Sequence, residues 1–257
     1  MTTTVNTVES VPYLGQWRLA RVDMANWGTF NGFQSLPVDR RGLLITGPSG
    51  SGKSTVLDAV AAVLTPPTQL SLNAAASNGG QRDKGRSISN YVRGACGHSA
   101  DEEGEVVHTY LRPKAAVWSG VMLRYEDGFD IGQCSPSEAR RHKAINVLGI
   151  FFQKANTVSP EGLKKFYAVV RGDHTLSEFE PYGLNEADMA QFNKDYKETG
   201  RAWRDHAAFE GYLCSILHIS SPKTLTLLHK TQAAKNIGSL DDLFHGTKQG
   251  RIEAVKF

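Results

Sequence analysis

The amino-acid sequence predicts an α/β fold in which a phosphate-binding loop connects a buried strand to a helix. The stretch GPSGSGKST, from Gly47 to Thr55, has the glycine, lysine and hydroxyl spacing of the loop that holds nucleotide phosphates. The apolar run Leu43 to Thr46 just before it predicts a buried central strand. Residues 54–64 after it, rich in Ala, Leu and Val, predict a buried helix that ends before Pro66.

Strand patterns lie on both sides of this loop and predict an antiparallel β lobe. Residues 17–22 and 29–38 precede the loop, and residues 106–112, 117–128 and 145–153 follow it. Asp127-Gly128 at the end of one pattern is a hairpin signal. Residues 73–104, rich in Gly, Asn and Ser, predict a loop with one helical turn near residues 87–94.

The last part of the chain has helical patterns, which predict a C-terminal helical segment. The four stretches are residues 161–172, 186–199, 205–219 and 222–236, several with Ser-Pro or Asn at the start and Gly past the end. The domain organisation that we predict is a flexible tail (1–13), a nucleotide-binding lobe (14–155), a helical lobe with a Q-loop-like segment (156–236) and a truncated tail (237–257).

Composition excludes several classes of protein. The 257 residues carry 29 Lys and Arg against 26 Asp and Glu, and a net charge of +3 does not by itself indicate nucleic-acid binding. No apolar run approaches the ~20 residues that span a bilayer, and the first residues lack the pattern of a secretory signal. Cys96, Cys134 and Cys214 are far apart, which favours buried thiols over disulfides or zinc. We expect a cytoplasmic protein with no membrane partner.

The loop residues have separate roles in the binding that they predict. The glycines allow backbone N–H groups to point at phosphate oxygens, and the helix start adds partial positive charge. Lys53 would contact the β- and γ-phosphates, and the Ser54 hydroxyl would bind Mg²⁺. The sequence therefore predicts that ATP or GTP is bound by the nine residues Gly47, Pro48, Ser49, Gly50, Ser51, Gly52, Lys53, Ser54 and Thr55.

Residues for hydrolysis are not identified in the sequence. A Walker B strand would end in a carboxylate that reaches Mg²⁺, but Arg124 interrupts the candidate VMLRYED, and LGIFFQ ends in Gln153. The string SNGGQR at residues 77–82 looks like an ABC signature, but it lies in a polar loop too soon after the phosphate-binding loop. We therefore predict no catalytic residue.

Several motifs together resemble one family. They are Asn26-Trp27-Gly28 with Phe30, the loop followed by Leu57-Asp58-Ala59, LNAAA (72–76), RSISNYVRGACG (86–97) and LLHKTQAAKNIGSLDDLF (227–244). The chain resembles the amino-terminal half of the ATPase head of the SMC, Rad50 and RecF class of ABC ATPases over most of residues 14–244. It is most similar to the MukB-like branch called MksB or JetC, the motor of the Wadjet plasmid-defence system.

The resemblance implies further site residues and partners. Gln232 would be the Q-loop glutamine, which contacts Mg²⁺ and the γ-phosphate of ATP. Arg86 and Arg93 would contact nucleotide or DNA phosphate, although Arg93 is equally well explained as a solvated loop cation. The implied partners are the C-terminal half-head and coiled coil of the same motor, a second head, kleisin-type and accessory subunits, and DNA. The implied role is chromosome organisation or plasmid defence.

Two other functions remain open from the sequence. One is a non-catalytic DNA-binding or assembly module, and the other is a stand-alone small P-loop NTPase or kinase that uses Asp58, Glu126 or Asp127 as its carboxylate. The long segment before the loop counts against a small kinase, and Asp58 is better explained as a structural hydrogen-bonding residue. Under the leading hypothesis, the chain alone binds ATP and Mg²⁺ but does not hydrolyse the nucleotide.

Overall fold

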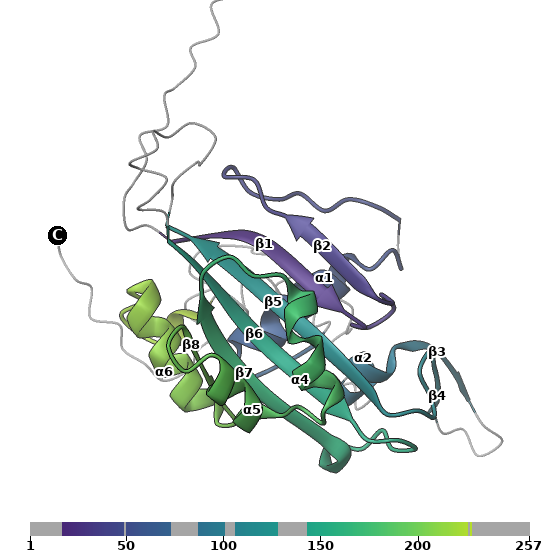
Figure 1. Cartoon of the computed structure of the whole chain (residues 1–257). Coiled ribbons are helices and arrows are strands. Elements are labelled where there is room, and N and C mark those ends of the chain that lie inside the picture. Colours follow the sequence, from purple (N-terminus) through teal and green to yellow (C-terminus); the bar gives the residue numbers. More distant parts are fainter. Residues whose placement is uncertain are drawn as a thin grey trace, which may run out of the picture.

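A six-stranded antiparallel sheet forms the centre of the molecule (Figure 1). The computed structural model describes residues 17–48, 50–72, 87–100, 106–127, 143–225 and 227. The strand order is β2-β1-β5-β6-β7-β8, and every neighbouring pair is antiparallel. The strands are β1 (Arg18–Ala25), β2 (Phe33–Pro37), β5 (Val117–Glu126), β6 (Ala144–Gln153), β7 (Leu163–Arg171) and β8 (Gly200–Trp203).

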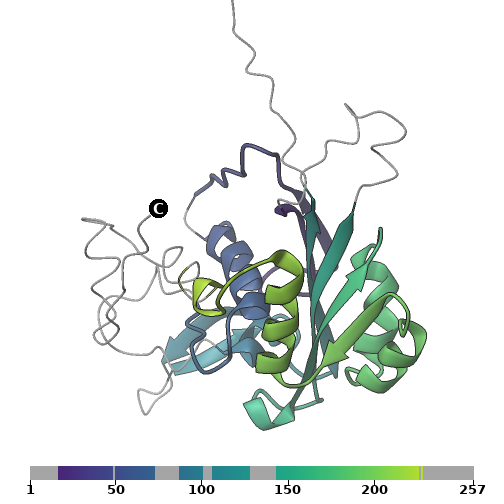
Figure 2. The ribbon, with the colours of Figure 1, turned by 90° about the vertical axis from the view of Figure 1, so that its left-hand side faces the viewer.

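Helices cover the two faces of this sheet (Figure 2). On the face that we call the inner face lie α1 (Lys53–Leu64), α2 (Ile88–Arg93) and α6 (His206–Leu217). Their apolar side chains form one core with Val22, Val121 and Tyr167 of the sheet. On the outer face lie η2 (Leu176–Phe179), α4 (Glu180–Leu184) and α5 (Met189–Asp195). The outer core is aromatic, with Trp118, Phe166, Phe179 and Phe192 fully or almost fully buried.

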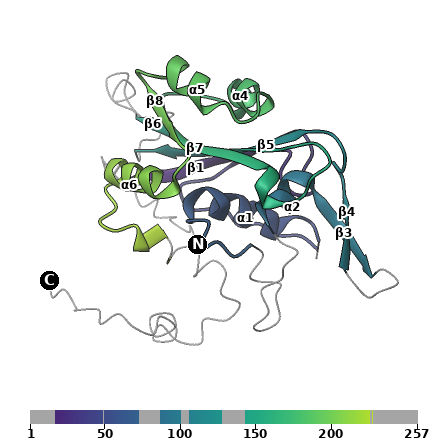
Figure 3. The same cartoon turned by 90° about the horizontal axis from the view of Figure 1, so that it is seen from below.

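A separate hairpin extends away from the sheet, as Figure 3 shows. Its strands are β3 (Ala95–Ala100) and β4 (Val106–Tyr110), which pair antiparallel. The hairpin follows α2 directly, because Gly94 at the end of α2 has a φ of 68° and turns the chain. Strand β3 lies in residues 73–104, where the sequence predicted a loop, so that part of the prediction is wrong.

The predicted α/β class with an antiparallel β lobe is confirmed, as are the helices at residues 54–64 and 205–219. The predicted helix at residues 161–172 is wrong, because Leu163–Arg171 is strand β7 after the short 3₁₀ helix η1 (Pro160–Gly162). Phe166 contributes to the outer core and Tyr167 to the inner core. A strand buried on both faces is continuously apolar and lacks the alternation that identifies a half-buried strand. The sheet also continues across the predicted lobe boundary between residues 155 and 156.

The structure also bears on three smaller predictions, about a turn, the cysteines and membrane-spanning helices. The turn predicted at Asp127-Gly128 is part of a longer connection between β5 and β6, in which the Asp127 N–H donates to the Lys143 carbonyl. Cys214 is buried as expected, but Cys96 is exposed, while Cys134 lies outside the described residues. Among the helices that the structure describes, none has the length and apolar character that crossing a bilayer requires.

The segment before the phosphate-binding loop differs most from expectation. Residues 43–46 were predicted to form a buried central strand, but they belong to no strand of either sheet. The Leu44 side chain is 87% exposed and Leu43 is 43% exposed. An apolar run in extended conformation becomes a buried strand only when neighbouring strands hydrogen-bond to it, and the six strands of the sheet leave it unpaired.

Candidate phosphate-binding site

The amino end of α1, which begins within the loop at residues 47–55, has no side-chain cap on its backbone donors. The residue before the helix is Gly52, with a φ of 91°, a conformation that favours glycine. Because glycine has no side chain, it cannot cap the first-turn amides as Ser or Asp would. Amides in the first turn of this helix are therefore available to an anion, and the helix dipole favours negative charge there.

Lys53 lies against the loop that it follows. Its Nζ donates to the carbonyl oxygens of Gly47 at 2.8 Å and Pro48 at 2.7 Å. These two acceptors are neutral, so a phosphate oxygen would be a stronger partner for the ammonium group. Backbone amides, an ammonium group and the Ser54 hydroxyl make a donor set that suits the phosphates of a nucleotide.

The turn Asn26–Phe30 forms the seat on which the loop and α1 rest. Trp27 is fully buried, and its Nε1–H donates to the Thr55 carbonyl at 3.1 Å. A Cβ on Gly28 would lie 2.6 Å from the Thr55 methyl group, so only glycine allows this approach. A Cβ on Gly52 would lie 2.7 Å from Cζ of Phe30. The motif Asn-Trp-Gly-x-Phe therefore contacts both the loop and the first turn of the helix.

Asp58 has a structural role in this protein. Its side chain is buried, and the Tyr91 hydroxyl of α2 donates to its Oδ2. The interpretation of Asp58 as a structural hydrogen-bonding residue is confirmed. Glu126 and Asp127 lie at the end of β5, whereas Asn26 is next to the β1 residue that pairs with Gly120 near its start. The structure therefore does not bring either carboxylate to the phosphate-binding loop.

Arg93 has a structural position that corrects both readings of it, as a phosphate contact and as a solvated cation. Its side chain is fully buried at the end of α2. Burial lowers the pKa of its guanidinium group. Four backbone carbonyls surround the group and accept its hydrogen bonds. The guanidinium donates to Thr157 O at 3.0 Å and Arg112 O at 2.9 Å, and also to Ala115 O and Lys154 O. The guanidinium is therefore engaged inside the protein and supports the backbone around it.

Arg112 is a residue of this region that the sequence did not single out. It follows β4, and its guanidinium donates to the carbonyls of Asn26, Gly28 and Val92. Burial lowers its pKa, and the charge of Arg93 lowers it further. The sequence shows only one more arginine after a strand, because backbone carbonyl acceptors leave no signal in it. Arg86, Gln232 and Ser49 of the predicted site lie outside the described residues.

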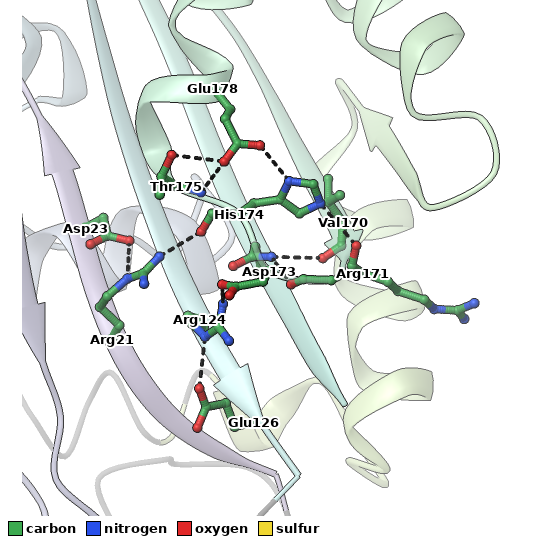
Figure 4. Close-up of polar contacts among 12 residues, drawn as sticks. Arg21, Asp23, Arg124, Glu126, Val170, Arg171, Asp173, His174, Thr175 and Glu178 are labelled. Atoms are coloured by element: carbon green, nitrogen blue, oxygen red, sulfur yellow. Dashed lines mark hydrogen bonds and ion pairs between the residues drawn. The ribbon is translucent and has the colours of Figure 1, made fainter. Parts of the chain in front are cut away.

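A second polar cluster lies on the outer face of the sheet (Figure 4). Arg124 of β5 contacts Glu126 at 2.9 Å and also Asp173, and Arg21 of β1 contacts Asp23 at 2.7 Å. Arg21 also donates to the His174 carbonyl at 2.8 Å. The cluster is on the opposite face of the sheet from α1, so it takes no part in the phosphate-binding site. Within the described part of the chain, no three His, Cys, Asp or Glu side chains gather as metal ligands would.

A comparison with protein families supports the identification of the phosphate-binding loop. The model of the P-loop containing region of AAA domains matches residues 19–79, which include most of β1, the loop and α1. The chain thus contains a P-loop nucleotide-binding region. A search of curated proteins gives no match.

One similar solved structure is described as "Structural biochemistry of ATP-driven dimerization and DNA stimulated activation of SMC ATPases". It is 16% identical, and the likeness covers 66% of this chain and 78% of that chain with a TM-score of 0.30.

Proposed function

We propose that this chain binds ATP with Mg²⁺ at Gly47–Thr55 and forms the amino-terminal half of an SMC-like ATPase head of the MukB type. The observation that carries the proposal is the uncapped amino end of α1, with Lys53 beside it, held on the sheet by the Trp27 turn. This arrangement provides amide donors and a positive charge where the phosphates of a nucleotide would lie. The family resemblance of the flanking motifs supports the SMC-like assignment.

The residues of the loop divide the work of binding. Amides of residues 50–55 would hold the phosphate oxygens, and Lys53 would exchange the Gly47 and Pro48 carbonyls for the β- and γ-phosphates. Ser54 and Gln232 would hold Mg²⁺, which neutralises phosphate charge when it is bound. Arg86 remains a proposed contact to nucleotide or DNA phosphate.

The exposed segment at residues 43–46 supports the view that this domain is one half of a head. Leu43 and Leu44 expose apolar surface directly before the loop, and strands outside the described sheet would bury it by pairing with it. We propose that these strands come from the C-terminal half-head of the same motor. A second head, kleisin-type and accessory subunits and DNA would complete the assembly, which would act in the cytoplasm in chromosome organisation or plasmid defence.

Nucleotide titration tests the proposal. We expect ATP with Mg²⁺ to raise the melting temperature of the chain, because a ligand at 100 times its Kd adds about 2.7 kcal/mol to the free energy of unfolding. Lys53→Ala should abolish most of this increase. Lys194→Ala, which changes an exposed lysine of α5 on the other face of the sheet, should leave it intact.

Measurements of melting temperature and of ATP hydrolysis distinguish the two other functions. An unchanged melting temperature at millimolar ATP with Mg²⁺ would contradict the proposal and favour a non-catalytic DNA-binding or assembly module. Sustained hydrolysis by the chain alone, lost in Lys53→Ala, would instead favour a stand-alone small NTPase. The half-head proposal predicts that the chain binds ATP with little or no hydrolysis.

A further inference from the structure

The Arg112 guanidinium lies between the Asn26–Phe30 turn and α2, and it contacts backbone on both sides. One amino nitrogen donates to Asn26 O at 3.0 Å and Gly28 O at 2.8 Å. The same nitrogen is 3.3 Å from Tyr91 O, and Nε donates to Val92 O at 2.9 Å. The other amino nitrogen donates to the Asn31 side-chain oxygen at 3.3 Å. The guanidinium thus connects two segments more than 60 residues apart in the sequence.

Neighbouring groups are arranged to receive this guanidinium. A Cβ on Gly94 would lie 2.7 Å from the Arg112 amino nitrogen and 2.8 Å from Gly28 O, so glycine at this position leaves the space that the contact needs. The Gly28 N–H donates to Tyr91 O at 2.9 Å, and the Ser119 hydroxyl donates to Asn26 O. The backbone of the turn is therefore fixed by α2, by β5 and by Arg112.

The other side of the same turn contacts the phosphate-binding loop. Trp27 bonds to Thr55 O, Gly28 packs on the Thr55 methyl group, and Phe30 packs on Gly52. Each contact falls on the loop or on the first turn of α1, where the donors for phosphate are located. A shift of the turn by a fraction of an ångström would therefore move these donors.

We propose that Arg112 is a positioning residue for nucleotide binding, which sets the position of the phosphate-binding amides through the Asn26–Phe30 turn. The inference rests on the proposed nucleotide binding for its functional consequence, but not for its structural part. Arginine suits the task because its planar group offers five N–H donors in fixed directions. A lysine could reach one or two of these acceptors, but it could not hold all of them in one geometry.

Arg112→Lys tests this inference, with Arg124→Lys as the matched control. Arg124 is also an arginine of the sheet region, because it lies in β5. Its partners Glu126 and Asp173 lie on the outer face, away from α1. Amide hydrogen exchange of the nucleotide-free protein is measured first. We expect exchange in residues 26–32 and 52–58 to become roughly tenfold faster in Arg112→Lys, the size of effect that losing one or two hydrogen bonds causes. The control should leave these segments unchanged.

The affinity for ATP with Mg²⁺ is measured second, on the same variants. We expect about tenfold weaker binding for Arg112→Lys and an unchanged value for Arg124→Lys. Unchanged exchange in residues 52–58 of Arg112→Lys would overturn the inference, and so would a uniform loss of protection across all six strands. If wild type binds no nucleotide while the local exchange effect is present, positioning by Arg112 stands and the proposed function fails.

Discussion

Buried and half-buried arginines hold opposite ends of the β5–β6 pair, and they do so in different ways. Near the start of β5, Arg93 and Arg112 donate mainly to backbone carbonyls. Near the end of β5, Arg124 lies between two carboxylates. The pKa of Arg93 and of Arg112 is lowered by burial. Burial also acts to lower the pKa of Arg124, but Glu126 and Asp173 raise it above its usual value.

The difference shows what each arrangement fixes in place. Carbonyl acceptors belong to the main chain, so Arg93 and Arg112 hold the path of the backbone, and Arg112 holds it at the turn that contacts the phosphate-binding loop. Carboxylate acceptors belong to side chains, so the Arg124 cluster holds the turn at Asp173 to the sheet through ion pairs that salt screens. The two ends should therefore respond differently to substitution, acid and salt.

The largest expected effect is that of Arg93→Met. The substitution removes the donor of four backbone carbonyls that surround a fully buried side chain, and an unsatisfied buried group costs about 1–3 kcal/mol. We expect the free energy of unfolding to fall by about 3 kcal/mol or more in denaturant titration. Arg201→Met, which changes an exposed arginine of β8, should cost less than about 1 kcal/mol. Equal losses in the two variants would contradict the structural role of Arg93.

Arg124→Met should have an intermediate effect. Glu126 keeps Arg18 as a partner at 2.9 Å, and the Asp173 side chain is 84% exposed, so neither carboxylate becomes an isolated buried charge. We expect a loss of about 1–2 kcal/mol by the same titration, below the 3–5 kcal/mol typical of a broken buried pair. A loss as large as that of Arg93→Met would remove the distinction between the two ends.

Acid should weaken the outer-face cluster through Glu178. Burial raises the pKa of Glu178, but hydrogen bonds from His174 and Thr175 more than offset this and lower it below its usual value. The folded protein then binds this proton less readily than the unfolded chain, so the stabilisation is present above about pH 4.5 and is lost as pH falls through the folded-state pKa.

Glu178→Gln checks this sign. We expect the variant to be less stable than wild type at pH 7, and the difference to shrink as the pH falls below about 4.5. Melting curves across this range measure it. A difference that grows on acidification would contradict the lowered pKa.

The smallest expected effect is that of Asp173→Asn. Exposed ion pairs contribute about 0–1 kcal/mol, and salt at 1 M, with a Debye length of about 3 Å, should reduce the difference further. Denaturant titration at low and high salt measures both quantities. A loss above about 2 kcal/mol would mean that the Asp173 contact is far stronger than its exposure allows.

The sequence could predict the elements whose signals are local. The glycines and lysine of the loop, and the Ala- and Val-rich helix after it, are features of neighbouring residues, and α1 forms where expected. Strand β7 was missed because Tyr167 and Phe166 are both buried, on opposite faces, which removes the alternation of a strand. The segment 43–46 has the composition of a buried strand, but pairing depends on residues far away in the sequence.

The supporting arginines could not be predicted for a different reason. Arg93 stands in a Gly- and Ser-rich surrounding that predicts a solvated loop, yet it is fully buried. Its partners are carbonyl groups of residues 112, 115, 154 and 157, and every residue type carries such a group. Only the folded path of the chain brings them together.

Amide NMR of the loop tests the central claim most directly. The spectra of wild type and Lys53→Ala are recorded with and without ATP and Mg²⁺. We expect the amides of Gly52–Thr55 to shift and gain protection from exchange in wild type, with the effect largely lost in Lys53→Ala. Unchanged Gly52–Thr55 amides at saturating nucleotide, or equal changes in both proteins, would contradict phosphate binding at the amino end of α1.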